Sequence, residues 1–225
     1  MHGTHLNEDI IVHSLVTDIY CDIEKRYGKD SSNPLPYHNV EHAKDVVNAI
    51  TAIGGLAVSR GKISSHELNL GIVAGAGHDY FRDGVHLVDE ATSAEAVAGK
   101  MGKYEEFSSD DMHNVWQLIL ATAVYFEDGV LKQMTPTDNY LAQTVADGDL
   151  ASLGRDTPTF WDRTTKVYEE EKKPIEEREA QRQFLDGTIC LLRNHEFFTE
   201  EARLFFPNQP VNLAYAEAMR GLIAS

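Results

Sequence analysis

Residues 68–79 read LNLGIVAGAGHD, an apolar run that ends in the adjacent pair His78 and Asp79. Ser64 and Glu67 precede the run with the spacing of a capping box, which predicts a helix that carries the pair at its far end. An imidazole beside an ionised carboxylate inside a core needs a cation to neutralise the charge, and both groups are common metal ligands. A single buried His-Asp pair is more often a hydrogen-bonded core contact, so the interpretation depends on what else the chain supplies.

Glycines at positions 71, 75 and 77 lie within the same predicted helix. Glycine lowers the stability of a helix because it gains no side-chain packing and loses much backbone entropy on folding. We therefore expect these glycines to allow a neighbouring helix to approach closely, or to leave room around the ligands.

Upstream, residues 37–42 read YHNVEH and supply two further histidines. His38 and His42 are four residues apart, so both imidazoles lie on one face of a predicted helix and can point into one cavity. One can then coordinate an ion while the other stays near a substrate. The HxxxH spacing is also frequent in zinc sites, so a site with both histidines as ligands remains open.

Downstream, Asp147 and Asp149 both fall in one predicted helical segment. Leu141, Val145 and Asp149 form a stripe at helical spacing, whereas Asp147 is rotated by about 200° from it. The pattern favours Asp149 as the ligand. Asp147 is expected to cap a helix, to position a water or to face solvent.

The rest of the chain also has helical periodicity. Helices are expected at about 7–27, 40–60, 64–79, 89–103, 109–126, 137–153, 160–171, 174–194, 198–206 and 211–223. No alternating pattern beside the Asp-Gly pairs at 83–84 and 128–129 indicates a β-hairpin, so both pairs are interpreted as loop turns. The sequence therefore predicts an all-α fold.

Length and composition predict one domain over residues 1–225, with a core at about 35–155 and a C-terminal helical extension at about 156–225. A net charge of −16 opposes binding to a nucleic acid polymer, which requires clustered cations. No apolar stretch reaches the length of a membrane span, and no signal peptide begins the chain, so a cytoplasmic location is expected.

Cys21 and Cys190 are expected to be packing thiols rather than a disulfide. Whether the chain forms a homo-oligomer stays open.

His38 and His42, then His78-Asp79, then Asp149 resemble the ordered H, HD, D signature of the HD-domain superfamily of metal-dependent phosphohydrolases. Residues 37–46 are especially similar to the corresponding helix of cyclic-nucleotide phosphodiesterases. The resemblance implies an HD-domain/PDEase-like helical bundle.

The resemblance also implies a site and an activity. A divalent ion (Mn, Mg, Fe, Ni, Co or Zn) would be held by His42, His78, Asp79 and Asp149, with His38 and Asp79 catalytic and His38 the proton donor. Histidine suits that role because its ordinary pKa of about 6.5 allows both protonation states. The implied activity is hydrolysis of a phosphoester or phosphoanhydride of a nucleotide or similar small molecule by a metal-activated water. The alternatives are a 3′,5′-cyclic-nucleotide phosphodiesterase and a non-catalytic metal-nucleotide sensor.

Two differences from the motifs of these families concern the binding of a second metal ion. Phosphodiesterases have a further histidine in an HDxxH pattern, but here residues 80–82 read YFR, and no histidine follows Thr122 at the spacing of two-metal relatives. A second tightly bound ion is therefore not expected, although His86, His113 and Glu90 are candidates to contribute.

Three residues are candidates for substrate binding: Arg82, Glu90 and Lys166. Glu90 resembles a glutamate of bacterial members, and Arg82 and Lys166, the latter with Arg163, are the cations expected near a phosphate. The charge run at residues 169–173 is interpreted as a solvated helix boundary that promotes solubility.

Overall fold

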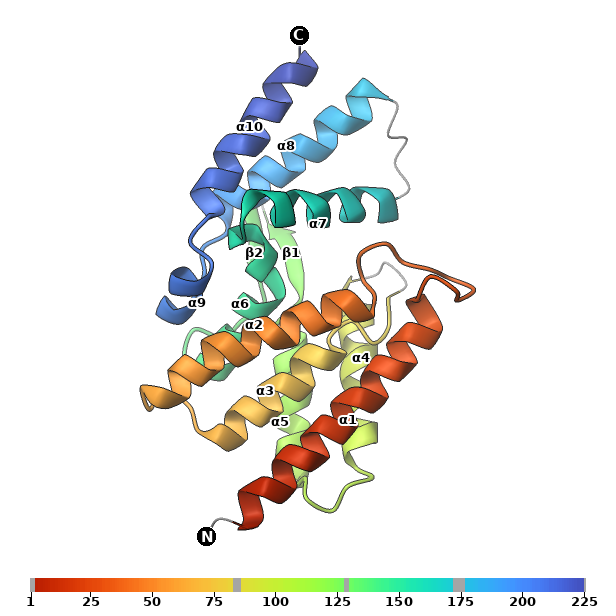
Figure 1. Ribbon diagram of the computed structural model, residues 1–225, viewed down its shortest axis with the longest axis vertical. Coiled ribbons are helices and arrows are strands. Elements are labelled where there is room, and N and C mark those ends of the chain that lie inside the picture. The colour runs from red at the N-terminus through yellow and green to blue at the C-terminus, as the bar shows by residue number, and fades with distance from the viewer. Residues whose placement is uncertain (1–2, 83–85, 128–129, 172–176, 225) are drawn as a thin grey trace.

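The computed structural model describes residues 3–82, 86–127, 130–171 and 177–224, which form an all-α fold with one short pair of strands (Figure 1). The elements in chain order are α1 (Gly3–Tyr27), α2 (Val40–Ser59), α3 (Ser65–Gly77), α4 (His86–Met101), α5 (Ser109–Leu120), β1 (Val124–Glu127), β2 (Val130–Gln133), α6 (Tyr140–Asp149), the 3₁₀ helix η1 (Leu150–Gly154), α7 (Thr157–Glu170), α8 (Arg178–Asn194), α9 (Glu200–Phe205) and α10 (Gln209–Ala224). The expected fold class is confirmed.

The expectation that the chain contains no β-hairpin is wrong. β1 pairs antiparallel with β2, from Val124 opposite Gln133 to Glu127 opposite Val130, so the expected helix at 109–126 ends early, at Leu120. The sequence here is rich in β-branched and aromatic residues, which fit a strand better than a helix. The intervening Asp-Gly pair is typical of a two-residue hairpin connection, but residues 128–129, like 83–85, lie outside the described residues.

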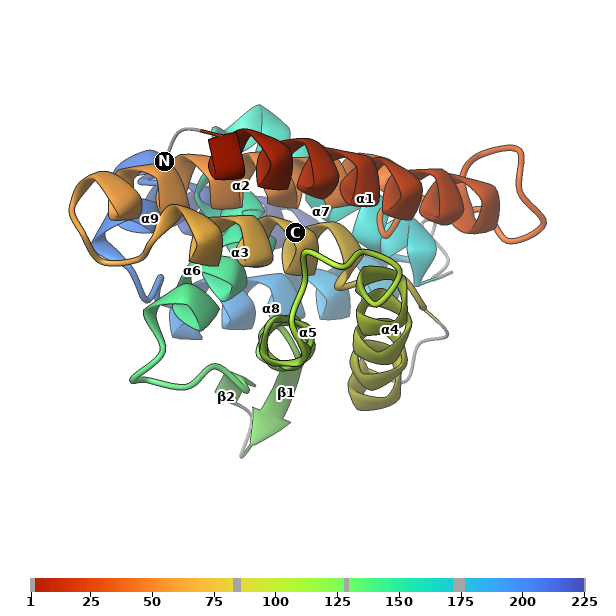
Figure 2. The same cartoon turned by 90° about the horizontal axis from the view of Figure 1, so that it is seen from below.

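Helix α3 lies among the N-terminal helices and packs against α1, α2, α5 and α6 (Figures 1 and 2). Its start is fixed locally by the expected capping box. The Glu67 amide donates to the Ser64 hydroxyl over 3.1 Å, and the Ser64 amide donates to the Glu67 carboxylate over 2.7 Å. The first turn therefore has partners for backbone groups that would otherwise be left without hydrogen bonds.

Two glycines let α2, α3 and α6 approach one another closely. A Cβ on Gly75 of α3 would lie 2.2 Å from Ile50 Cδ1, and one on Gly148 of α6 would lie 2.4 Å from Ile50 Cγ1. Ile50 of α2 is fully buried between them. The expected close approach is confirmed, and it brings the ends of the three helices together.

The C-terminal helices α7, α8 and α10 pack on one another and on η1 around a second apolar cluster, Leu153, Phe160, Ile189, Leu192 and Ala216. Asn212 of α10 joins this group to η1, since its side-chain amide donates to the carbonyls of Leu153 and Arg155. Helix α9 packs on α2. The end of α7 lies next to the segment that precedes α2, where Glu170 accepts from the amides of Tyr37 and His38.

None of the described helices combines the length and the apolar character needed to span a membrane. No disulfide joins Cys21 and Cys190. Cys21 is exposed, so the expectation that it packs in the interior is wrong.

Candidate metal centre

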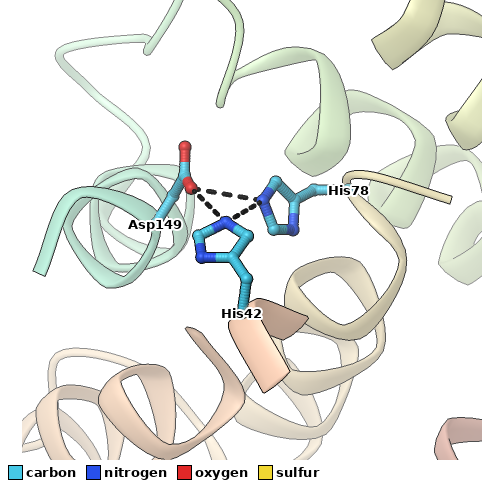
Figure 3. Close-up of side chains that lie close together, drawn as sticks. All are labelled: His42, His78 and Asp149. Atoms are coloured by element: carbon cyan, nitrogen blue, oxygen red, sulfur yellow. Dashed lines mark hydrogen bonds and ion pairs between the residues drawn. The ribbon is translucent and has the colours of Figure 1, made fainter. Parts of the chain in front are cut away.

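Three helix ends converge on one buried point. His42 lies in the first turn of α2, His78 caps the C-terminal end of α3, and Asp149 is the last residue of α6. One ligand atom from each of the three side chains lies within 4.8 Å of the others (Figure 3). Both histidines are buried, and Asp149 is partly buried.

The distances between these atoms match those within a metal coordination shell. The Nε2 atoms of His42 and His78 are 3.2 Å apart. Asp149 Oδ1 lies 3.4 Å from His42 Nε2 and 3.2 Å from His78 Nε2. Asp79 Oδ2 approaches the same two nitrogens at 3.4 and 3.1 Å. An ion bound at about 2.0–2.2 Å separates its neighbouring ligand atoms by about 3.0–3.5 Å. The cluster could therefore hold a metal ion.

The orientation of His78 is fixed by the backbone of its own helix. Its Nδ1–H donates to the Gly75 carbonyl over 2.9 Å, which leaves Nε2 with a lone pair directed at the cluster. The C-terminal ends of α3 and α6 also carry partial negative charge. Both effects favour a cation at this point.

The charges of the cluster shift the ionisation of its members. Burial alone lowers the pKa of His78 and of His42, but the carboxylates of Asp79 and Asp149 outweigh it and raise both. Burial likewise opposes ionisation of the two carboxyls, yet the imidazoles hold the pKa of Asp79 and of Asp149 well below the usual range. The carboxylates therefore stay ionised at neutral pH and attract positive charge.

His38 lies beside the cluster without joining it. Its Nδ1 pairs with Glu170 Oε1 at the end of α7, and its ring centroid is 5.6 Å from that of His42. The second oxygen of Glu170 accepts from the amides of His38 and Tyr37 over 2.9 and 3.0 Å. The imidazole and these two amides lower the pKa of Glu170 although burial raises it. One carboxylate thus fixes both the ring and the backbone of His38.

The contact of Glu170 with His38 was not predicted from the sequence. The interpretation of residues 169–173 as a wholly solvated boundary is wrong for this residue, whose side chain is only 14% exposed. Residues 169–171 are three consecutive glutamates, so no local signal distinguishes the one that contacts His38. Residues 172 and 173 lie outside the described residues.

Asp147 lies outside the cluster but does not face solvent. It is fully buried, and its carboxylate accepts from the amides of Phe198 and Thr199 and from the Thr199 hydroxyl. Thr199 is the N-cap of α9, so Asp147 holds the start of that helix. Burial raises the pKa of Asp147 to about 6.

Arg82 and Glu90 lie on the Asp79 side of the cluster. Arg82 approaches the second oxygen of Asp79 at 3.7 Å and Glu90 Oε1 at 3.9 Å. Glu90 is buried, and no residue in the described part of the chain bonds to its Oε2. Burial, with repulsion from Asp79, raises the pKa of Glu90 to about 7. The structure thus places both residues next to a candidate ligand.

Lys166 and Arg163 line a pocket next to His42, whereas His113 does not contribute to the described cluster. Lys166 pairs with Asp162 at 2.9 Å, and Arg163 pairs with Asp45 at 2.5 Å, both from α7. His113 is exposed and bonds to Gln117. The side chain of His86 lies outside the described residues.

No protein-family model matches the chain, and no curated protein matches it. The resemblance to HD-domain phosphohydrolases therefore rests on residues 37–46, the His78-Asp79 pair and Asp149. The function has to be inferred from the chemistry of the site.

Proposed function

We propose that the chain is a metal-dependent phosphohydrolase of the HD type, which cleaves a phosphoester or phosphoanhydride of a nucleotide or similar small molecule. The observation that carries the proposal is that His38, whose ring and backbone amide are held by Glu170, lies beside four converging ligand groups. A ligand cluster alone would fit a structural ion or a sensor. The adjacent proton donor is what favours catalysis.

Charge balance supports a divalent ion in the cluster. As metal ligands both imidazoles are neutral, so with two carboxylates they carry a net charge of −2, which one divalent cation cancels. Without an ion, protons on the imidazoles offset the carboxylates. A set of two nitrogen and two oxygen ligands suits Mn, Fe, Co, Ni or Zn better than Mg. Such an ion polarises a phosphoryl oxygen and lowers the pKa of a water molecule toward neutrality.

His38 is suited to protonate the leaving oxygen. Glu170 occupies Nδ1, so the proton available for transfer is on Nε2, for which no partner exists among the described residues. The ring is partly exposed, with 15% of its side-chain surface accessible, so a substrate can reach it. Glu170 acts through His38 by fixing its tautomer and orientation, which makes Glu170 a positioning residue.

The proposal is tested by a screen of the purified protein with each of these divalent ions. The substrates are mononucleotides, deoxynucleoside triphosphates, 3′,5′-cyclic nucleotides and generic phosphoesters. Turnover of cyclic nucleotides alone would assign the phosphodiesterase alternative, which residues 37–46 favour. Nucleotide and metal binding without any turnover would assign a sensor and overturn the proposed activity.

The role of His38 is tested in the active assay. His38→Ala should keep the metal and slow hydrolysis by about a hundredfold or more. The deficit should shrink for a nitrophenyl ester, whose leaving oxygen needs little protonation. Glu170→Gln should give a smaller loss, in kcat rather than KM, with a changed pH profile. Loss of the metal in His38→Ala would show that His38 is a ligand, and full activity would show that another group delivers the proton.

A further inference from the structure

A cavity of about 190 Å³ lies where α7 crosses the start of α2. We call it the α2 pocket; its lining includes Tyr37, Asn39, Glu41, His42, Arg163 and Lys166. At about 30 Å³ for each water molecule, it has room for a tetrahedral oxyanion with a few waters. It is smaller than the roughly 300 Å³ or more of pockets for drug-sized ligands.

His42 presents an unused donor beside this pocket. Its Nε2 faces the ligand cluster, so Nδ1 lies on the opposite side of the ring (Figure 3). A neutral imidazole that coordinates through Nε2 carries its proton on Nδ1 and usually donates it to an acceptor. His78 has such an acceptor in the Gly75 carbonyl, whereas within the described ranges nothing accepts from His42 Nδ1. The side chain is only 6% exposed and lines the α2 pocket, which is large enough to admit an acceptor.

The surroundings of the α2 pocket favour negative charge in that position. Arg163 and Lys166 reach it from α7, and the Arg163 Nε is buried with no partner in the described part of the chain. The N-terminus of α2, capped by Asn39, adds partial positive charge.

The acidic groups nearby do not cancel this field. Glu41 also lines the pocket, but its side chain is 66% exposed and pairs with Lys44 at 2.8 Å. Lys166 pairs with Asp162 in a solvent-exposed ion pair, which contributes little to stability and can rearrange. Arg163 pairs with Asp45 and, at 3.2 Å, with the same Asp162 oxygen that Lys166 contacts, but its Nε has no partner in the described part of the chain.

We propose that the α2 pocket binds a phosphate-like oxyanion, which accepts a hydrogen bond from His42 Nδ1 and ion-pairs with Lys166 and Arg163. The site is separate from the position of the metal, because the imidazole ring of His42 lies between them. An anion on Nδ1 makes Nε2 a stronger ligand, so the two sites are coupled. The coupling and the tautomer of His42 rest on the proposed metal centre, whereas the contacts to Lys166 and Arg163 do not.

The test uses inorganic phosphate and AMP as probes, titrated by calorimetry into the full chain with and without an added divalent ion. Lys166→Glu should weaken phosphate binding at least about tenfold, as expected for loss of a charge-assisted hydrogen bond. Lys166→Arg should bind normally, and Lys25→Glu on α1 makes the same change in net charge away from the pocket. In ¹⁵N NMR, phosphate should shift His42 Nδ1 in the wild type but not in Lys166→Glu. AMP binding with the same Lys166 dependence would identify the anion as part of a nucleotide, whereas binding of phosphate alone would identify a free anion.

The outcomes separate this proposal from the proposed function. Lys166-dependent phosphate binding by a protein that holds no metal would support the anion site while the proposed function fails. Phosphate binding that requires the metal and is equal in Lys166→Glu and Lys25→Glu would place the phosphate on the metal and overturn the anion site. Absence of phosphate binding, with water as the only partner of His42 Nδ1, would also overturn it.

Discussion

Asp147 and Asp149 show how two identical side chains near one helix end acquire different roles. Asp149 points to two imidazoles, whereas Asp147 accepts three hydrogen bonds from Phe198 and Thr199. The first contributes charge to a site, and the second connects α6 to α9. Their substitutions should therefore separate metal binding from stability.

Asp149→Asn should abolish retention of the divalent ion, because the cluster loses one of its two ionised ligands. Asp147→Asn should keep the ion but lower the free energy of unfolding by about 1–3 kcal/mol, because an amide replaces a carboxylate that faces N–H and O–H donors. Elemental analysis and urea unfolding of both variants measure the two effects. Loss of the ion in Asp147→Asn alone would reverse the assignment.

At the scale of elements, close approach of helices sets the geometry of the site. Gly75→Ala should destabilise the protein by about 1–3 kcal/mol, because the new methyl group meets Ile50 and overpacks the contact between α2 and α3. Gly55→Ala, in α2 with no atom near its Cβ, should stabilise it by about 0.4–1 kcal/mol. Urea unfolding of the two variants checks the difference in sign. A neutral Gly75→Ala would mean that Ile50 moves aside without cost.

His66 joins three helices through its two ring nitrogens. Nδ1 pairs with Glu8 of α1 and Nε2 with Asp111 of α5, each at 2.8 Å, so both nitrogens donate when the ring is charged. Burial lowers the pKa of His66, but the two carboxylates raise it to a net value above normal. Stability from this contact is thus fully present below the unfolded-state pKa of about 6.5 and is lost as pH rises through the folded-state value.

The stability difference between wild type and His66→Gln should accordingly be larger at about pH 5.5 than at about pH 8.5. Asp111 has a lowered pKa and stays ionised across this window, so the change belongs to His66. Thermal melts at constant ionic strength measure it. An equal difference at both pH values would show that the ring is not charged in the contact.

For the whole molecule, the proposed ion would join α2, α3 and α6 at a single point. Chelation should therefore lower Tm, and readdition of the ion should restore it. At a free concentration of one hundred times Kd, an ion that binds only the folded state stabilises it by about 2.7 kcal/mol. Calorimetry with and without chelator measures the shift, and Asp149→Asn serves as the control that should not respond. If the chelator did not change the Tm of the wild type, the result would count against the metal centre.

Features that depend on neighbours along the chain could be predicted from the amino-acid sequence. The helix with Ser64 and Glu67 at its start and His78 at its end follows from a capping box and an apolar run, both of which act over a few residues. The helical periodicity of the remaining segments likewise gave the all-α class. The pairing of β1 with β2 was not predicted, because helical periodicity extends into a segment whose β-branched and aromatic residues favour a strand.

Features that depend on contacts between distant residues required the folded structure. Glu170 reaches His38 across 132 positions of sequence, and nothing local distinguishes it from Glu169 or Glu171. The apolar stripe of α6 favours Asp149 and predicts that Asp147 faces away from the core, whereas residues on both sides of α6 are buried. Periodicity describes one face of a helix, while burial and partners depend on every element packed around it, and those elements are fixed only when the chain has folded.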